Sequence, residues 1–220
     1  MNVLLRFYNL RGLHLLLLVL SGNLLLIWLT RAFLIDETVF YNSFGEQLTW
    51  ERTLQLYANF RQLSWLSYIF NPLVLLIKFS LISFVLYLGI MFIKTEYSIS
   101  LSSVLRVVIA SEIAIMLGSL SKFTWFCLFA GNYSLPDIEF FYPASLINIF
   151  KITDLDKIWI YPLQTINIFH ILYILLLSFG LTHICKIGKP DSEKIVLAAY
   201  LPSLLLWITL VMVLTVNITV

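Results

Sequence analysis

Charged residues are scarce in this chain of 220 residues, of which only 12% are Asp, Glu, Lys or Arg and 60% are hydrophobic. A soluble domain carries roughly 25% charged and roughly 45–50% apolar residues. A water-soluble fold of this size has too much surface to hide so many apolar side chains. The composition therefore excludes a soluble globular protein and predicts an integral membrane protein, since lipid is the solvent that suits the excess.

Cysteine, histidine and net charge are also low. The two cysteines and three histidines show no spacing typical of a metal site, and we expect no cofactor. A net charge of +2 without a basic cluster argues against a nucleic-acid partner. The H-E-x-x-H and G-x-S-x-G motifs of hydrolases and the P-loop of nucleotide-binding proteins are missing from the sequence. We therefore expect a non-enzymatic protein that binds no nucleotide.

Long apolar runs are abundant. Five of them approach the roughly 20 residues that a helix needs to cross the hydrocarbon, and they lie at 13–30, 72–93, 104–130, 163–184 and 195–216. We predict an all-α transmembrane helix bundle of five spans, forming one membrane domain over residues 1–220 with outer segments at 31–71 and 131–162. Pro72 and Pro162 are expected to open the second and fourth spans, where a first-turn proline is tolerated. Pro202 is expected to kink the fifth span.

The positive charges favour one orientation, because Lys and Arg gather on the cytoplasmic side of membrane proteins. With the N-terminus inside and the C-terminus outside, the basic residues beside the spans all fall on that side: Arg6, Arg11, Lys94, Arg106, Lys186, Lys189 and Lys194. Much Ile, Leu, Phe and Asn with little Ala is typical of an AT-rich bacterial genome. We therefore predict a multi-pass protein of the bacterial inner membrane.

The outer segment between the first two spans is too polar to cross the membrane, yet it has a helical pattern. The stretch from Ser43 to Glu46 has the spacing of a capping box. Apolar residues then recur at helical intervals, and they are Trp50, Leu54 and Tyr57 together with Leu56, Phe60 and Leu63. We predict an amphipathic helix on the outer face. A folded loop without a special role is the alternative.

Glu112 is the sharpest candidate for chemistry, because a carboxyl group at membrane depth is costly unless it is protonated, paired or hydrated. His14 and His183 lie at similar predicted depth and are its candidate partners. The functional hypothesis is a proton-sensing or ion-coordinating site. The alternative is a structural hydrogen bond between helices.

A second set of polar residues follows the start of the fourth span. Gln164, Asn167 and His170 are spaced to form a polar stripe on one helix face, which hydrogen bonds between helices explain without a binding site. Lys78 and Lys122 lie towards the outer ends of the second and third spans. We interpret both lysines as side chains that reach to the interface.

Three short segments resemble the Yip family of five-helix membrane proteins, in particular its bacterial relatives. They are Ser100–Val108 before and into the third span, Leu163–Phe169 at the start of the fourth, and Ser178–Leu181 near its end. The resemblance covers roughly the second half of the chain. It implies a non-enzymatic membrane protein of the scaffold or trafficking-adaptor type. The first half lacks the hydrophilic cytoplasmic region that eukaryotic relatives use in GTPase binding.

Three functions remain open. The first, which we favour, is an accessory or scaffold subunit that contacts membrane lipids and other membrane protein subunits, because little of the chain lies outside the spans. The second is a small-solute or ion transporter or channel acting as an oligomer, which needs a polar path through the bundle. The third is an intramembrane enzyme, which needs a nucleophile and a base that converge at membrane depth.

Overall fold

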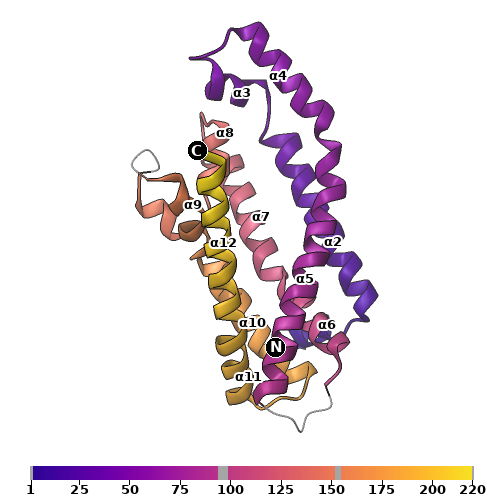
Figure 1. The fold of residues 1–220 in the computed structure, drawn as a ribbon. Helices are drawn as coiled ribbons and strands as arrows, with labels where there is room; N and C mark the ends of the chain where they lie inside the picture. Colours follow the sequence, from indigo (N-terminus) through magenta and orange to yellow (C-terminus); the bar gives the residue numbers. More distant parts are fainter. Residues whose placement is uncertain (1, 94–98, 152–154, 220) are drawn as a thin grey trace.

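The computed structural model describes residues 2–93, 99–151 and 155–219, and these residues form helices without any strand (Figure 1). Helices make up 82% of the structure. In chain order they are α1 (Asn2–Tyr8), α2 (Gly12–Phe33), α3 (Glu37–Phe44), α4 (Trp50–Leu63), α5 (Trp65–Ile93), α6 (Leu101–Ser111), α7 (Ile113–Leu128), α8 (Leu135–Phe140), the 3-10 helix η1 (Leu146–Ile149), α9 (Lys157–Thr165), α10 (Ile168–Ile184), α11 (Lys189–Ile195), the π-helix η3 (Val196–Tyr200) and α12 (Leu201–Thr219).

Four helical rods are long and apolar enough to cross a membrane. They are α2, α5, the pair α6–α7, and the continuous series α11–η3–α12. The most apolar windows of these rods are between 11% and 50% buried, so most of their apolar side chains face outward, as expected for helices in lipid. The structure therefore confirms the all-helical fold, and its four long apolar helices support the prediction of a membrane protein. The fifth predicted span corresponds to α10, which is apolar but has only 17 residues.

Two predicted span boundaries need correction, and both involve proline. Pro72 does not open the second span, because α5 already begins at Trp65 and carries Pro72 inside it. The break between α4 and α5 lies instead at Ser64, whose N–H donates to the carbonyl of Arg61 in a tighter turn. A proline removes only one backbone donor, and an apolar helix flanked by other helices tolerates that loss.

The fourth predicted span is also divided differently. Pro162 lies inside α9, and the chain leaves helical geometry at Ile166 and Asn167 before α10 begins at Ile168. Asn167 has an extended backbone, and its Oδ1 accepts the N–H of His170 at 2.8 Å. Asparagine is a preferred N-cap residue, so this side chain starts α10 well after the position that Pro162 would give.

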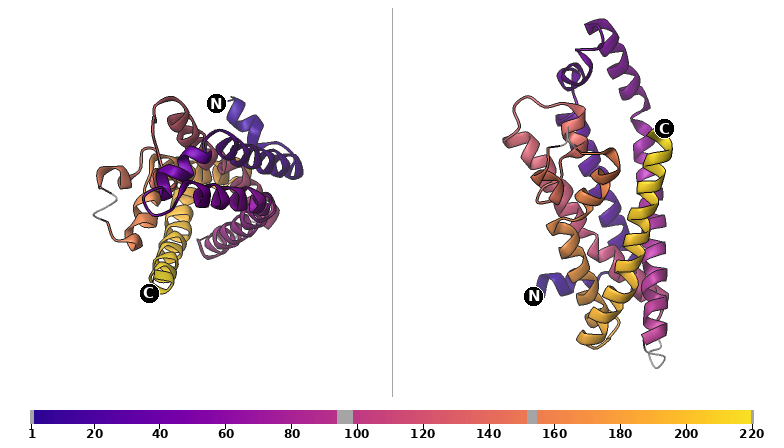
Figure 2. Two further views of the ribbon diagram at one scale, coloured as in Figure 1. Left: turned by 90° about the horizontal axis from the view of Figure 1, so that it is seen from above. Right: turned by 60° about the vertical axis from the view of Figure 1, so that its left-hand side comes forward.

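The core lies in the half of the bundle that contains α1, where α10 packs against α6, α7 and α11. Following the predicted orientation, we name this end the inner end and the opposite end the outer end. Gly180 of α10 permits the closest approach: a Cβ atom there would lie 2.5 Å from Val107 Cγ1 and 2.7 Å from the ring of Tyr8. Tyr8 ends α1, which runs across the bundle near its inner end (Figure 2, right). The small residue thus lets an aromatic ring from outside the spans reach the centre of the core.

The outer end carries an arm, which we define as α3 and α4 together. In Figures 1 and 2 it projects beyond the rest of the bundle, with α4 leading into α5. Phe40 of α3 is buried against the rings of Tyr57 and Phe60, both 5.3 Å away between ring centroids. The helix predicted between the first two spans is therefore present as α4, and its location on the outer face stays a prediction. The base of the arm is tied to α8 by α3, whose Ser43 Oγ accepts the N–H of Leu135 at 2.8 Å.

The predicted capping box at Ser43 is wrong. Ser43 lies inside α3 and hydrogen bonds the carbonyl of Val39 at 2.6 Å, whereas α4 starts after Thr49 without a side-chain cap. A complete capping box occurs instead at Ser134 and Asp137, which begin α8. The same spacing thus arises with and without a helix start, because the flanking turn decides whether the side chain meets free N–H groups.

Candidate functional site

A buried ion pair joins α5 to the junction between α6 and α7. Lys78 Nζ lies 2.7 Å from Glu112 Oε1 and 2.8 Å from Oε2. The exposed fraction of the side chain is 1% for Glu112 and 34% for Lys78. Removing a carboxylate from water costs several kcal/mol unless a partner compensates, and here one ammonium group donates to both oxygens.

Glu112 occupies a break in the helix. It separates α6 from α7, and its N–H bonds the carbonyl of Ile109 at 3.3 Å in a 3-10-like turn. The preceding face of α6 is fully buried, with Val107, Val108 and Ala110 inaccessible to solvent. α5 packs directly against this helix, so the fold brings Lys78 to the carboxylate.

The ion pair lies well away from the ends of the two apolar rods that carry it. At about 1.5 Å per residue, Lys78 is about 22 Å from Ile93 at the inner end of α5, and Glu112 is about 17 Å along the chain axis from Leu101 at the start of α6. A hydrocarbon layer is about 30 Å thick. If the two rods cross the membrane from Ile93 and from Leu101, both groups fall within that thickness, where an ionisable residue is rare and marks a functional-site hypothesis.

Aromatic and histidine side chains surround the ammonium group. The ring of Tyr173 lies 5.7 Å from Lys78 Nζ, a cation–π distance. Tyr173 also packs against Tyr200, and the Tyr200 hydroxyl is 2.8 Å from His170 Nε2. The hydroxyl of Tyr173 is buried without a hydrogen-bond partner among the described residues. Two helices, α10 and η3, thus add polar groups to a site whose charges come from α5 and Glu112.

The π-helix η3 positions Tyr200 within the bundle. Tyr200 is its last residue and is 3% exposed, and Pro202 follows two residues later. A proline cannot donate its own backbone hydrogen bond, and wider turns of this kind occur often at functional sites. The chain therefore has a π-helix just before Pro202, and the predicted kink at this proline stays a prediction.

A second polar contact lies on the inner side of the ion pair. The Tyr8 hydroxyl donates to the carbonyl of Leu176 at 2.9 Å and lies 3.1 Å from Ser111 Oγ. Ser111 is the residue before Glu112 and is inaccessible to solvent. A polar contact next to the ion pair is therefore connected to α1, which lies at the inner end.

The two histidines predicted as partners of Glu112 lie elsewhere. His14 is exposed on the first turn of α2. His183 is exposed at the last turn of α10, where its Nδ1 is 2.9 Å from the carbonyl of Phe179 and its ring stacks on that residue. The observed partner of Glu112 is Lys78, which the sequence pattern assigned to the interface. The position of a residue along its predicted span does not show which helices are neighbours. The sequence therefore could not identify the partner of Glu112.

The predicted polar stripe is not on one helix, because the chain breaks between its members. Gln164 lies in α9, and its Nε2 donates to the carbonyls of Glu139 and Phe140. Asn167 is the N-cap of α10, and His170 lies in the first turn. Only His170 joins the groups around the ion pair, while the other two residues hold local structure.

The arm presents apolar side chains to its surroundings. Five large ones are between 36% and 59% exposed on α4 and the start of α5, and they are Trp50, Leu56, Phe60, Leu63 and Trp65. Its base is fixed by Arg31 of α2, whose guanidinium donates to the carbonyl of Ser64 at 2.7 Å and to Ser67 Oγ at 2.5 Å. The same guanidinium lies over the Phe60 ring at 5.3 Å. The exposed surface thus belongs to a helix that is anchored at its lower end.

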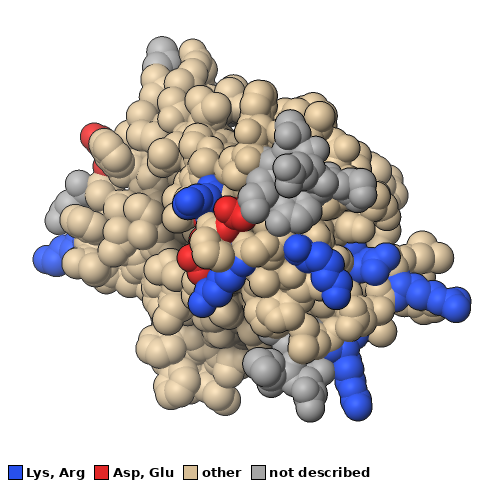
Figure 3. All heavy atoms as spheres, turned by 90° about the horizontal axis from the view of Figure 1, so that it is seen from below, with Lys and Arg blue, Asp and Glu red and all other residues tan. Residues whose placement is uncertain are grey.

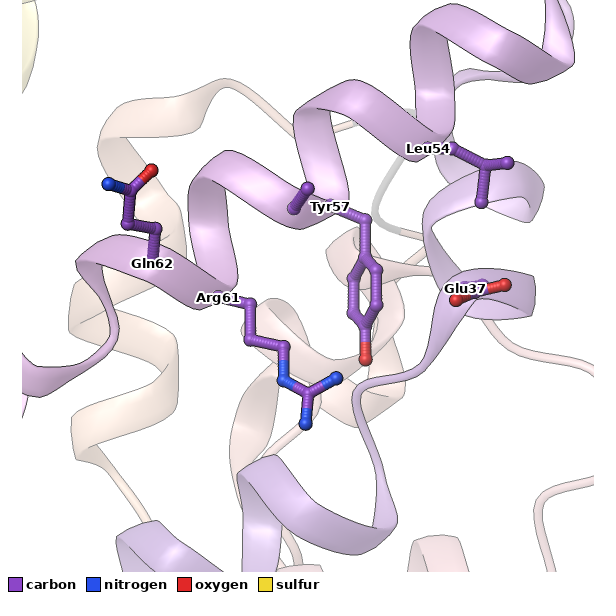
Figure 4. Close-up of a pocket in the computed structure, with 6 residues that line it drawn as sticks. Glu37, Leu54, Tyr57, Arg61 and Gln62 are labelled. Carbon is purple, nitrogen blue, oxygen red and sulfur yellow. The ribbon is translucent and has the colours of Figure 1, made fainter.

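A groove opens between α3 and α4, with a volume of about 530 Å³. Figure 4 shows Tyr57 between Glu37 of α3 and Arg61 of α4. Opposite charges therefore flank an aromatic ring in this groove. Among the residues that the structure describes, no three His, Cys, Asp or Glu side chains lie close enough to hold a metal ion.

Comparison of the chain with models of protein families, with curated proteins and with solved structures finds no match in any of the three. The resemblance to the Yip family therefore stays a prediction that depends on three short sequence segments. The chemistry of the ion pair and the exposure of the arm are the observations from which function must be argued.

Proposed function

We propose that this chain is a non-enzymatic accessory or scaffold subunit of a larger assembly in the bacterial inner membrane, and that it binds a partner membrane protein through its outer arm. The observation that carries this proposal is the exposed apolar surface of α4, held on an anchored helix outside the hydrocarbon. The bundle serves as the platform that holds the arm at the membrane surface.

The charges support five spans with the N-terminus inside. Figure 3, which views the molecule from below, shows more Lys and Arg than Asp and Glu on that face. Exposed basic residues near the ends of α1, α2, α10 and α11 are Arg6, Arg11, Lys186, Lys189 and Lys194. Lys94 lies outside the described residues. α10 is about 26 Å long at about 1.5 Å per residue, and it serves as the fifth span because other helices enclose much of it. A helix surrounded by protein need not match the full lipid thickness.

In this orientation the apolar residues of the arm lie outside the hydrocarbon layer. About 20 residues of α5, counted from Ile93, cross a hydrocarbon layer of about 30 Å. α4 and the first turns of α5 therefore lie beyond that layer, in the headgroups and the water outside. Exposed aromatic and leucine side chains in such a place mark a site of protein interaction.

The surroundings of these side chains fit a protein partner. Trp50 and Leu63 are accompanied on α4 by Glu51, Arg52 and Arg61, so charges of both signs border the apolar residues. Interfaces commonly combine aromatic anchors with a polar rim of this kind. An outer loop or domain of another membrane protein, with an apolar patch inside a mixed-charge border, is the partner that suits this surface.

The test is gentle solubilisation of the chromosomally tagged protein at its native level, followed by sizing and mass spectrometry. We expect a stoichiometric membrane protein partner with the wild type. The triple variant Trp50→Ser, Leu56→Ser, Leu63→Ser is expected to lose that partner. The variant Gln55→Ser, Asn59→Ser, which changes exposed polar residues of the same helix, serves as the matched control and keeps it. A wild-type protein that elutes alone or only with copies of itself would overturn the proposal.

A further inference from the structure

The ion pair lies in the bundle and not in the arm, so the partner binding proposed above does not explain it. We propose that Lys78 and Glu112 form a proton-exchange site within the helix bundle, with one route to Glu112 from the inner side and another to Lys78 from the outer side. The ligand of this site is the proton. The proposal does not depend on the partner protein proposed above.

The contact between the two groups suits proton transfer. Lys78 Nζ is within 2.8 Å of both carboxylate oxygens, so a proton can pass from nitrogen to oxygen without movement of either helix. In that step an N–H bond breaks and an O–H bond forms, and the ion pair becomes a neutral amine and a neutral carboxylic acid. The net charge of the site is zero before and after. Apolar surroundings disfavour charged groups, so they favour the neutral pair over the ion pair more than water does.

The inner route follows the contact between α1 and α6. Tyr8 comes from the helix that crosses the inner end of the bundle, and its hydroxyl reaches Ser111, the neighbour of Glu112. Hydroxyl groups both donate and accept hydrogen bonds, as a proton relay requires. Glu112 itself is 1% exposed, so in this proposal a proton reaches it through the protein interior, on the side where the Tyr8–Ser111 contact lies one residue before it in the chain.

The outer route begins at the ammonium group. The Lys78 side chain is 34% exposed, unlike Glu112. The Tyr173 hydroxyl next to it is buried without a protein partner among the described residues. Buried polar groups normally pair with protein or ordered water, so this unpaired hydroxyl is the polar group beside Lys78 to which a proton leaving the ammonium group could pass. Beyond it, Tyr200 and His170 share a hydrogen bond of 2.8 Å.

Titratable groups face the ion pair from several elements. They are Tyr8 of α1, His170 and Tyr173 of α10, Tyr200 of η3, and Tyr142 from the segment between α8 and η1. The Tyr142 hydroxyl packs over Gly118 of α7, where a Cβ atom would collide with it. Four of these five groups are phenols and the fifth is an imidazole, so the site is polar without a second fixed charge among them.

The exchange takes place in three proton transfers. A proton that arrives from the inner side binds Glu112 and forms an O–H bond. Lys78 then releases its proton to the outer side, and the proton on Glu112 moves to the Lys78 nitrogen, which restores the ion pair. One proton has crossed and no other bond has changed. The reverse order moves a proton inward.

The experiment is proton flux in proteoliposomes that contain the full chain and a pH-sensitive dye, with a potassium diffusion potential as the driving force. We expect flux above that of empty vesicles. Glu112→Gln and Lys78→Met should each lower it by about a hundredfold, the low end of what loss of a proton-transfer group costs. Lys122→Met is the matched control, since Lys122 is another half-buried lysine within a span and is not paired with Glu112. It should conduct as the wild type does.

A second variant separates proton exchange from folding. The double change Lys78→Gln, Glu112→Gln keeps hydrogen bonding between the helices but removes both proton-exchange groups, so it should be monodisperse, helical and without flux. Folded wild-type protein without flux above empty vesicles would overturn the proposal. Flux in the double variant equal to that of the wild type would overturn it as well. The triple arm variant should conduct normally, which distinguishes this result from the partner experiment.

Discussion

The bundle around Glu112 and the arm of α3 and α4 are both helical, but they place polar and apolar groups in opposite ways. In the bundle, a carboxylate is buried among apolar side chains and has a cation as its partner. In the arm, Trp50 and Leu63 are 48% and 59% exposed among charged residues. The buried carboxylate has its partner within the chain, whereas the apolar side chains of the arm are left exposed. This contrast is the reason for the proposal that the bundle supplies stability and the arm supplies the interaction.

The largest expected effect is the loss of one member of the ion pair. Glu112→Ala should lower the free energy of unfolding by about 3–5 kcal/mol, because it leaves the Lys78 ammonium without its partner inside the bundle. Trp50→Ala in the arm is the comparison and should change it little. Thermal unfolding in detergent, followed by circular dichroism, measures both. Equal effects of the two variants would remove the distinction between bundle and arm.

Close packing in the bundle gives the next effect. Gly180→Ala should cost about 1–3 kcal/mol, since its Cβ atom would lie 2.5 Å from Val107 and must displace it. Gly131→Ala is the control, because nothing lies within 4 Å of a Cβ atom at that position. The same unfolding measurement applies. A Gly180→Ala protein as stable as the control would show that α6 and α10 have room for a methyl group between them.

The anchoring of the arm can be tested locally. Arg31→Lys keeps the charge but loses the fork of N–H groups that reaches Ser64 and Ser67. We expect a small change in the unfolding temperature but faster cleavage within residues 45–64 by a protease added from the outer side. Arg52→Lys, at an exposed position of the same arm, should leave the cleavage rate unchanged. An Arg31→Lys rate equal to that of the wild type would argue against the anchor.

Helix capping at the start of α10 gives the smallest effect. Asn167→Ala should cost about 1 kcal/mol, the usual value for the loss of an N-cap side chain. Asn132→Ala at an exposed position outside the helices is the control. Unfolding midpoints that do not differ between these variants would mean that α10 starts without help from this cap.

The class of the protein and most of its helices could be predicted from the sequence, because apolar content and helical periodicity are local properties. The outer helix was visible in the spacing of Trp50, Leu54 and Tyr57 for this reason. The pairing of Lys78 with Glu112 could not be predicted. Lipid-facing and core-facing residues of a membrane helix are both apolar, so the pattern does not indicate which helices are neighbours or which way a lysine points.

Helix boundaries were less predictable where one residue had two possible roles. Pro72 could open a helix or lie within one, and the neighbouring residues Trp65–Asn71 extended the helix past it. Asn167 could lie on a helical stripe or cap a helix, and its extended backbone shows the second. In both cases the decision depends on contacts with other helices, which spacing along the chain does not contain.

Site-specific photo-crosslinking in living cells tests the central contrast most directly. A photoreactive amino acid is placed at Gln55 on the exposed side of the arm, and in a parallel strain at Leu206, which is 72% exposed on α12. The account predicts a discrete crosslink to one membrane protein from position 55 and none to that protein from position 206. A crosslink to the same protein from position 206 and none from position 55 would contradict it, because the partner would then bind the bundle and not the arm.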